Sequence, residues 1–485
     1  MTIDELKKIE DQTSSQDGED VVEYKPDKED SEEVAVSSIY SVGAQIAQER
    51  DHPIRYRSCS WQKTTALLMS EYICLAILSF PHNGISTFSI LGMAPAVIVT
   101  IAVAASVQYT SYILWRFCLK HPEVRDVCDI GRIIFGGSDR GYNFTAVMFI
   151  LNNTFIQGFH CLVGAKLLNT LTNASQCTIL FSFISALICF LVSLPRTLNF
   201  LGGLGTFSAL MMSVAILLAL VFSGIQLHPE GFTPDLGDAI VRAWPVPGTS
   251  FVLGMGAFLN ITFTFVGQIT LPSIIAEMKE PRQFLKPLTL STIAGTVVYT
   301  LTGAIMYHFV GNQYMTAPAL ASLLPLYKKI TFCFAIPTIF YLGALYCSVT
   351  TRFIFFRIYA HSKHRYTNTL QAWFTWGGIM AISWTLAFLI AEMIPFFSDM
   401  LSLMSALFDG WFGFIYWALC YLILYPPSER WKGYQRSAET VLNYFLVAVG
   451  SFMTVAGTYV SIQSIINSYK TSTVGGVFSC VSNGV

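Results

Sequence analysis

The stretch Phe263-Thr264-Phe265-Val266-Gly267-Gln268-Ile269-Thr270-Leu271-Pro272 interrupts an apolar run that covers residues 249–278. A similar interruption, Ser79-Phe80-Pro81-His82-Asn83-Gly84, lies in the apolar run 64–91. Proline removes a backbone donor and glycine weakens a helix, so the hydrogen bonds of a helix are expected to fail at both places. The interrupted runs are the first and the sixth of the chain, and an odd number of crossings per repeat inverts the second half relative to the first. We therefore expect two inverted halves of five helices each.

The composition indicates that these runs lie in lipid. Charged residues make up 12% of the chain and hydrophobic residues 53%, whereas a soluble domain carries about 25% charged residues. Thirteen of the thirty acidic residues lie between Asp4 and Glu33, so the remainder is poorer still in charge. Runs of about 20 apolar residues cross the hydrocarbon core of a membrane. No basic face indicates a nucleic-acid partner.

Eleven apolar runs predict an all-α polytopic membrane protein with eleven transmembrane helices. Residues 1–57 have too little apolar surface to fold and are expected to form a disordered, acidic, cytoplasmic tail. We expect the first repeat in residues 58–228, the second in 245–426, helix eleven in 439–468 and a short external tail in 469–485. The runs cover residues 64–91, 94–118, 142–168, 177–194, 202–226, 249–278, 287–310, 327–358, 371–392, 398–424 and 440–467.

Lysine and arginine residues predict the orientation, because cytoplasmic connections are enriched in them. With the N-terminus in the cytoplasm, cytoplasmic segments flanking the runs hold nineteen of these residues and external ones hold five, Lys166 among them. One miscounted helix would invert every later connection and remove this asymmetry. We expect a cytoplasmic N-terminus and an external C-terminus.

Two features of the predicted external side concern covalent modification. Asn173-Ala174-Ser175 is a glycosylation acceptor sequence in the loop after the third run. Cys177 and Cys480 are the two cysteines expected outside the bilayer, where they either form a disulfide or remain two unlinked thiols. The other cysteines lie mostly inside apolar runs, and none has metal-ligand spacing.

The two interruptions predict a binding site at the membrane midplane. Backbone that leaves helical geometry at this depth is tolerated only beside protein or a watery cavity. A half-helix that starts near Gly84 would direct N–H groups at a carboxylate, and the carbonyl ends near Leu78 and Phe265 would suit a cation. The alternative is that proline and glycine merely kink these helices. The candidate binding residues are Ser79, Phe80, Pro81, His82, Asn83, Gly84, Thr264, Phe265, Val266, Gly267 and Gln268.

The interrupted segments resemble a known family. Residues 263–281 are similar to the sixth-helix signature of the amino acid/auxin permease family, and residues 76–81 to its first-helix break. Residues 351–358 and 391–397 resemble its fungal branch. The resemblance extends over residues 60–465 and implies a LeuT-like fold of five plus five helices with an eleventh appended. It also implies uptake of neutral aliphatic or aromatic amino acids, usually with protons.

Ionisable residues inside a membrane run are functional candidates, because charge is costly there. Asp409 lies in the middle of the tenth run and is our first candidate for a proton carrier, its alternative being a structural acid bonded to a helix end. Glu71 lies about two turns before the first break and pairs either with a cytoplasmic arginine or with a nearby hydroxyl. His160 and Glu277 are further candidates for proton coupling or gating. Glu392, near the outer interface, is expected to be solvated.

Two hydroxyl residues in the eighth run, Ser348 and Thr351, share a helix face. In LeuT-like proteins this region supplies a sodium site, so the resemblance implies a possible ion site. The alternative, which we favour, is that the hydroxyls form hydrogen bonds between helices.

These observations predict a plasma-membrane symporter that takes up neutral amino acids with the proton gradient and needs no cofactor, sodium coupling being less favoured. A vacuolar or other endomembrane exporter of the same fold is the first alternative, and a nutrient-sensing receptor is the second. No nucleotide loop, metal cluster or nucleophile motif indicates an enzyme. Lysines and Ser31 in the acidic tail suggest control of endocytosis through a ubiquitin ligase or its adaptor.

Overall fold

The computed structural model of this protein describes residues 59–73, 87–196, 198–316, 319–359, 362, 364, 367–471 and 476–481. Everything below refers to these residues. The expected tail, residues 1–57, and the expected break at residues 79–84 lie outside them.

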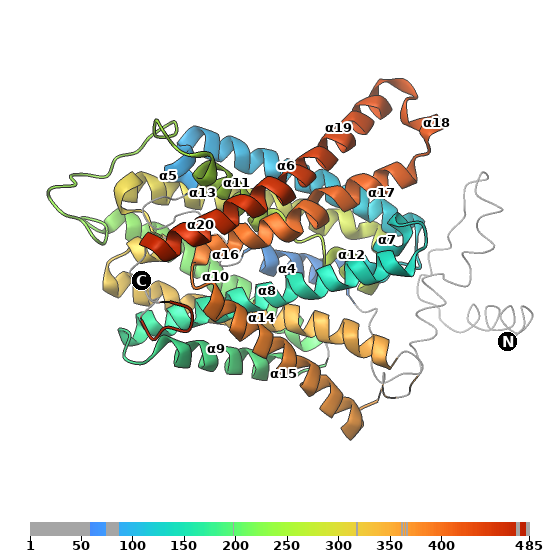
Figure 1. Cartoon of the computed structure of the whole chain (residues 1–485), viewed down its shortest axis with the longest axis horizontal. Helices are drawn as coiled ribbons and strands as arrows, with labels where there is room; N and C mark the ends of the chain where they lie inside the picture. Colours follow the sequence, from blue (N-terminus) through green and yellow to red (C-terminus); the bar gives the residue numbers. More distant parts are fainter. Residues whose placement is uncertain are drawn as a thin grey trace, which may run out of the picture. The chain divides into compact units, whose positions relative to one another are not determined.

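Helices form nearly all of the described structure (Figure 1). Eight described stretches are helical, long and apolar enough to cross a membrane, and two further apolar helices are shorter. The long ones are α6 (Met93–Lys120), α8 (Asp139–Thr172), α10 (Leu198–Ile225), α13 (Leu285–Tyr314), α14 (Pro325–Ile358), α15 (Leu370–Met393), Phe397–Leu424 and Gly433–Lys470. The shorter ones are α9 (Thr178–Ser193) and α11 (Phe251–Phe265).

Polar side chains set the starts of several helices. Ser250 accepts a hydrogen bond from the backbone N–H of Leu253 at the start of α11, and Thr369 accepts one from Ala372 at the start of α15. Such caps satisfy N–H groups that the first turn of a helix leaves free. Large apolar residues such as Leu217 and Ile382 stay more than 60% exposed within their helices. These exposed faces are what lipid would cover.

The sixth apolar run is broken where the sequence predicts it. α11 ends at Phe265, Val266 has extended backbone angles (φ −85°, ψ 103°), and helix resumes as α12 (Leu271–Glu277). In the first run, α4 (Trp61–Tyr72) precedes the undescribed residues 74–86, and α5 (Thr87–Leu91) follows them.

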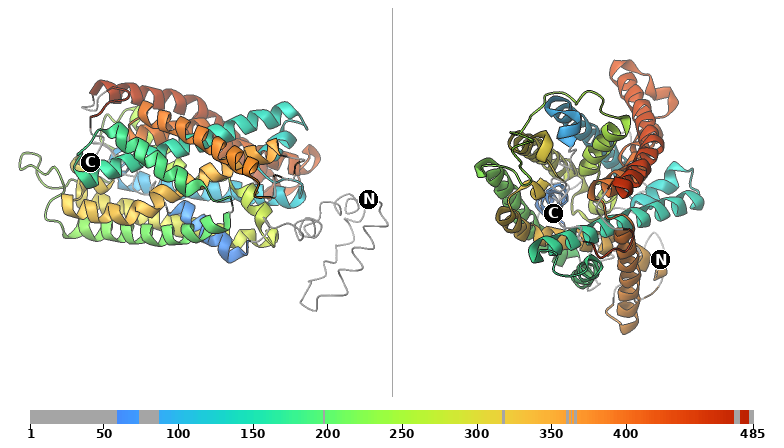
Figure 2. Two further views of the ribbon diagram at one scale, coloured as in Figure 1. Left: turned by 90° about the horizontal axis from the view of Figure 1, so that it is seen from below. Right: turned by 60° about the vertical axis from the view of Figure 1, so that its left-hand side comes forward.

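The inner helices of the bundle are α8, α14 and the stretch Phe397–Leu424. They have the largest buried shares of the long apolar helices, whereas α15 and the stretch Gly433–Lys470 are only one-third buried. Both of the latter lie at the edge of the bundle (Figure 2). α8 packs on α14, α15 and α9, and α10 packs on α14.

The tenth and eleventh membrane helices leave α-helical geometry and contact each other there. The tenth consists of α16 (Phe397–Met404), the π-helical segment η6 (Ser405–Ile415) and α17 (Tyr416–Leu424). The eleventh consists of α19 (Gly433–Phe452), the π-helical segment η7 (Met453–Gly457) and α20 (Thr458–Thr471). A Cβ atom on Gly410 would lie 2.6 Å from the carbonyl oxygen of Gly450, and one on Gly450 would lie 2.6 Å from that of Gly410. The absence of side chains at these two positions therefore permits the contact.

A short amphipathic helix, α7 (Val127–Ile134), lies between α6 and α8, in the connection between the second and third predicted membrane runs. Its buried residues Val127, Cys128 and Ile130 pack against α8 and α17, and the side chain of Asp126 accepts hydrogen bonds from the N–H groups of Cys128 (2.8 Å) and Asp129 (3.2 Å). An N-cap acid followed by apolar residues at helical spacing is the signal that could have predicted it.

Asp126 makes the stability of this region depend on pH. Burial, reinforced by the neighbouring negative charge of Asp129, raises its pKa to about 7. The folded protein therefore holds this proton more tightly than the unfolded chain, and stability decreases as pH rises from about 4 to 7. Asp126→Asn keeps a cap oxygen and should reduce this decrease, leaving the variant roughly 2 °C or more above wild type at pH 8. Melting curves of detergent-solubilised protein between pH 5 and 8 measure this, and parallel curves for the two proteins would contradict it.

A disulfide joins Cys177, just before α9, to Cys480 in the C-terminal segment. Thr178 also donates a hydrogen bond to the carbonyl of Val481 (2.9 Å), which holds this segment over the ends of α9 and α15. The expected solvation of Glu392 is therefore wrong. Glu392 is only 6% exposed, because residues of the tethered segment help to enclose it.

Two more residues of the predicted external side have defined positions. Asn173 ends α8 with a left-handed backbone (φ 55°) and is exposed, and its Oδ1 accepts a hydrogen bond from Nζ of Lys329 (2.8 Å). Its glycosylation stays a prediction. Lys166, counted with the external connections, instead lies within α8 and is 8% exposed.

Candidate functional site

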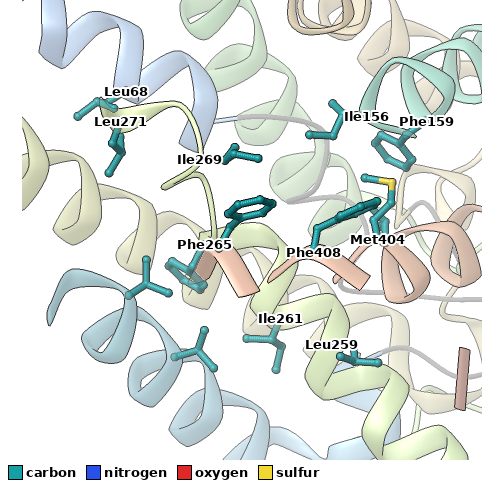
Figure 3. Packing of buried hydrophobic residues seen from close by; sticks show 14 of the residues in the cluster. Leu68, Ile156, Phe159, Leu259, Ile261, Phe265, Ile269, Leu271, Met404 and Phe408 are labelled. Carbon is teal, nitrogen blue, oxygen red and sulfur yellow. The ribbon is translucent and has the colours of Figure 1, made fainter. Parts of the chain in front are cut away.

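A cavity lies beside the break of the sixth run. Residues of α4, α8, α11, the break itself, α14 and η6 line it, so both halves of the chain contribute. Figure 3 shows Phe159 of α8 close to Met404 and Phe408 of the tenth helix near this place. The lining residues are Glu71, Tyr72, Asn152, Ile156, Phe159, His160, Phe263, Thr264, Phe265, Val266, Gly267, Ile269, Leu342, Tyr346, Asp409 and Phe412.

The break is held in place by its own polar side chains. Gln268 is buried, and its Nε2 donates to Oγ1 of Thr110 in α6 (2.8 Å) and to the carbonyl of Gly413 in η6 (3.4 Å). The hydroxyl of Thr270 donates to the carbonyl of Gly267 (2.9 Å). Gln268 therefore anchors the break and does not line the cavity, whereas the predicted residues Thr264, Phe265, Val266 and Gly267 do line it.

Two carboxyl groups from distant parts of the sequence face this cavity. The carboxyl oxygens of Glu71 of α4 lie 3.5 Å from the hydroxyl oxygen of Thr270, so Glu71 contacts a hydroxyl, one of the two predicted alternatives. A Cβ atom on Gly267 would lie 3.7 Å from Oε2 of Glu71, which places the carboxyl group beside the break. Asp409 of η6 is 5% exposed, and its Oδ2 has no hydrogen-bond partner among the described residues.

His160 of α8 shares the cavity with these acids. It is 4% exposed, and its Nδ1 has no hydrogen-bond partner within the described part of the chain. The described residues contain no group of three or more histidine, cysteine, aspartate or glutamate side chains that could hold a metal ion. The polar chemistry of the described lining therefore comes from two carboxyl groups, one imidazole, hydroxyls, an amide and backbone groups.

The rest of the lining is apolar and largely aromatic. The rings of Phe159 and Phe263 lie 6.3 Å apart, and Ile156, Leu342 and Phe412 complete this wall. The sequence predicted Phe265 as a binding residue but not Tyr72, Asn152, Ile156, Phe159, Leu342, Tyr346 or Phe412. Asn152 and Asn153, adjacent polar residues inside an apolar run, were the available signal for α8. The apolar lining residues gave no such signal, because residues that pack in the core and residues that line a cavity follow the same hydrophobic periodicity along a helix.

A largely buried ion pair lies on the side of the break that the sequence predicts to be cytoplasmic. Glu277, the last residue of α12, pairs with Arg352 of α14, and both side chains are at most 15% exposed. The backbone of Cys59 joins the same place, because its N–H donates to the carbonyl of Glu277 (3.1 Å) and its carbonyl accepts from the N–H of Lys279 (2.9 Å). Glu277 thus lies outside the cavity, where it ties the broken sixth helix to α14.

The two hydroxyls proposed for an ion site do not line the cavity. Ser348 donates to the carbonyl of Ser193 in α9 (3.4 Å), and the Thr351 hydroxyl lies 3.9 Å from the sulfur of Cys347 one turn earlier. The first of these is a bond between helices, as in the alternative that we favoured.

Comparison with known proteins gives consistent matches. Residues 57–463 match the family described as transmembrane amino acid transporter protein. The chain is 32% identical over 429 residues to the N amino acid transport system protein of Neurospora crassa. The aligned region covers 88% of this chain and 89% of the relative. The chain is 26% identical over 439 residues to a transmembrane transporter of Gibberella moniliformis, covering 90% and 91% of the two chains.

A solved structure shows the same fold. Mhp1, a nucleobase-cation-symport-1 family transporter in a closed conformation with bromovinylhydantoin bound, matches with a TM-score of 0.53 at 15% identity. The match covers 87% of this chain and 94% of that protein. The predicted LeuT-like fold is confirmed.

Proposed function

Because this chain belongs to the transmembrane amino acid transporter family, we propose that it imports neutral amino acids into the cytosol together with protons, across the plasma membrane. It is a membrane-embedded amino acid transporter and not an enzyme. The preference for neutral substrates, the coupling to protons, the direction and the membrane are our proposal.

The chemistry of the cavity supports an apolar or aromatic neutral substrate. An amino acid presents an ammonium, a carboxylate and a side chain. The break offers helix-end carbonyls and Glu71 to the ammonium, and the wall of Phe159, Phe263, Ile156 and Phe412 offers apolar surface to the side chain. Burying an apolar side chain such as leucine contributes about 1.5–3 kcal/mol. The broken sixth helix beside this wall is the observation that carries the proposal.

Proton coupling is supported by Asp409. A carboxylate buried without a cation is costly, so such a group tends to bind a proton when substrate fills the cavity. Taking that proton from an acidic exterior and releasing it inside would couple the two movements. Alternating access then needs a cytoplasmic gate, a role that we assign to the pair of Glu277 with Arg352, to open after the outer side has closed.

Uptake in a transport-deficient fungal strain tests this proposal. Labelled leucine and phenylalanine should enter faster at pH 5 than at pH 7, by up to about tenfold per pH unit where protonation limits the rate. A protonophore should abolish accumulation above the external concentration. Uptake indifferent to both treatments would remove the coupling, and absent uptake of neutral amino acids would remove the substrate class.

Location and regulation need separate measurements. A fluorescent tag should place the protein at the cell surface, and a vacuolar signal would instead support the exporter. Deleting residues 2–50 should raise surface abundance without changing uptake per molecule, if tail lysines are targets of a ubiquitin ligase. A loss of signalling with uptake intact would favour the receptor.

A further inference from the structure

We propose that the transporter has a second substrate class, cationic amino acids, which it carries without a coupled proton. The inference rests on the proposed function and extends it. It arises from the two carboxyl groups that face one cavity.

The described lining of the cavity has an unbalanced set of charges. Glu71 and Asp409 are both acidic, and no lysine or arginine is among the described lining residues. Asp409 is buried to more than nine-tenths, and no described residue bonds its Oδ2. One carboxylate suffices for the ammonium of an amino acid. The second leaves a place for one more positive charge.

The titratable groups around Asp409 are few. Tyr72, His160 and Tyr346 share the cavity with the two acids. Of the helices packed against η6, α19 brings Tyr434, Tyr444, Arg436 and Glu439, the last two of which pair with each other at 3.0 Å, and α16 brings Asp399. α6 brings Tyr109, Tyr112, Arg116, Cys118 and Lys120, and α17 brings Tyr416, Cys420 and Tyr421. α20 brings Tyr459, Tyr469 and Lys470, whereas α11 and η7 bring no titratable residue. None of the titratable residues that these packed elements bring lines the cavity.

The second positive charge has two possible sources. With a neutral amino acid, a proton on Asp409 neutralises the carboxyl group. With a cationic amino acid, the side-chain ammonium or guanidinium pairs with the ionised carboxylate, which gives a charge-assisted hydrogen bond in place of a buried unpaired charge. The loaded cavity holds the same net charge in both cases, so the same conformational change serves both substrates.

Proton and cationic side chain therefore compete for one carboxylate. Transport of leucine should move one charge and one proton, whereas transport of lysine should move one charge and no proton. Acidic pH should favour leucine and disfavour lysine.

The chain supplies a matched control for substitutions at Asp409. Asp399, on the preceding α16, is 3% exposed, and its carboxylate accepts hydrogen bonds from Ser464 (2.7 Å) and Ser468 (2.6 Å) of α20. It does not line the cavity. Asp399→Asn thus removes a buried acid of the same helix without touching the site.

The experiment uses the full chain reconstituted in proteoliposomes with a pH-sensitive dye inside. Labelled leucine and labelled lysine are supplied at a fixed membrane potential. We expect lysine to compete with leucine, leucine but not lysine to acidify the lumen, and lysine uptake to be maintained or raised from pH 5 to 7.5. Asp409→Asn should lower lysine uptake at least about tenfold, which corresponds to 1.4 kcal/mol, whereas Asp399→Asn should retain it.

Three results would overturn the inference. One is lumen acidification with lysine equal to that with leucine. Another is equal lysine uptake by Asp409→Asn and wild type. The third is failure of a hundredfold excess of lysine to inhibit proton-coupled leucine uptake. In these cases leucine transport persists and the proposed function stands, whereas a loss of leucine transport by wild type would contradict the proposed function itself. The wild-type competition and dye measurements do not depend on the folding of any variant.

Discussion

Asp409→Asn is expected to abolish concentrative uptake of neutral amino acids while leaving entry down a gradient. A gradient of two pH units supplies about 2.7 kcal/mol through one proton, enough for about a hundredfold accumulation. Asparagine has nearly the shape of aspartate but cannot carry that proton. The variant should therefore bring leucine only to its external concentration. Time courses of labelled leucine at pH 5, with and without a protonophore, measure the plateau.

The interpretation depends on two checks. Asp399→Asn, in the same helix but outside the cavity, should accumulate leucine as wild type does. Exchange of preloaded against external leucine should continue in Asp409→Asn, because exchange needs no net proton movement. Wild-type accumulation by Asp409→Asn would exclude this residue as the proton carrier.

Breaking the ion pair between Glu277 and Arg352 is expected to have the second large effect. Loss of one partner from a buried pair costs about 3–5 kcal/mol. The two side chains are 12% and 15% exposed, so about 1–3 kcal/mol is a fairer expectation after solvent screening. If the pair holds the cytoplasmic gate closed, Arg352→Gln should shift the protein towards the inward-open state and raise KM for external leucine about five- to a hundredfold.

A charge swap and a native cysteine test this assignment. Glu277→Arg combined with Arg352→Glu should recover part of the lost affinity, which a merely structural defect would not do. Cys59 pairs through its backbone with Glu277 and Lys279, and burial, together with the charge of Glu277, raises the pKa of its thiol. In a Cys333→Ser background, which removes the exposed free cysteine of the described residues, maleimide should label Cys59 faster with Arg352→Gln than without it. Equal labelling and unchanged KM would contradict the gate.

The fold could be predicted because it depends on features that local sequence carries. Gly267 weakens a helix, and Pro272 suits only the first turn of one, where it lies in α12; the chain does leave helical geometry between Phe265 and Leu271. The apolar runs could be predicted for a similar reason, because the free energy of transfer into lipid is largely a sum over individual residues.

The lining of the site could be predicted only in part. Asp409 and Glu71 stood out because charge is rare in apolar runs, and both face the cavity. Phe159, Leu342 and Phe412 also line the cavity but did not stand out in the sequence, because their role depends on which helices pack together. Gln268 was placed in the binding set but bonds to Thr110 and Gly413 instead. Glu392 was expected in water because its local sequence gives no sign of the covering C-terminal segment, which is tethered by a disulfide between Cys177 and Cys480, 303 residues apart.

The π-helical geometry of η6 has a consequence for the history of this chain. A π-turn closes its hydrogen bond over one residue more than an α-turn, and such turns are frequent at functional sites. Removing one residue from Ser405–Ile415 should let this segment tighten towards α-helix, so that α17 keeps its orientation while the side chains within the segment change theirs. The orientation of Asp409 thus depends on residue number as well as on residue type. Homologues one residue shorter here are expected to present a different side chain to the substrate.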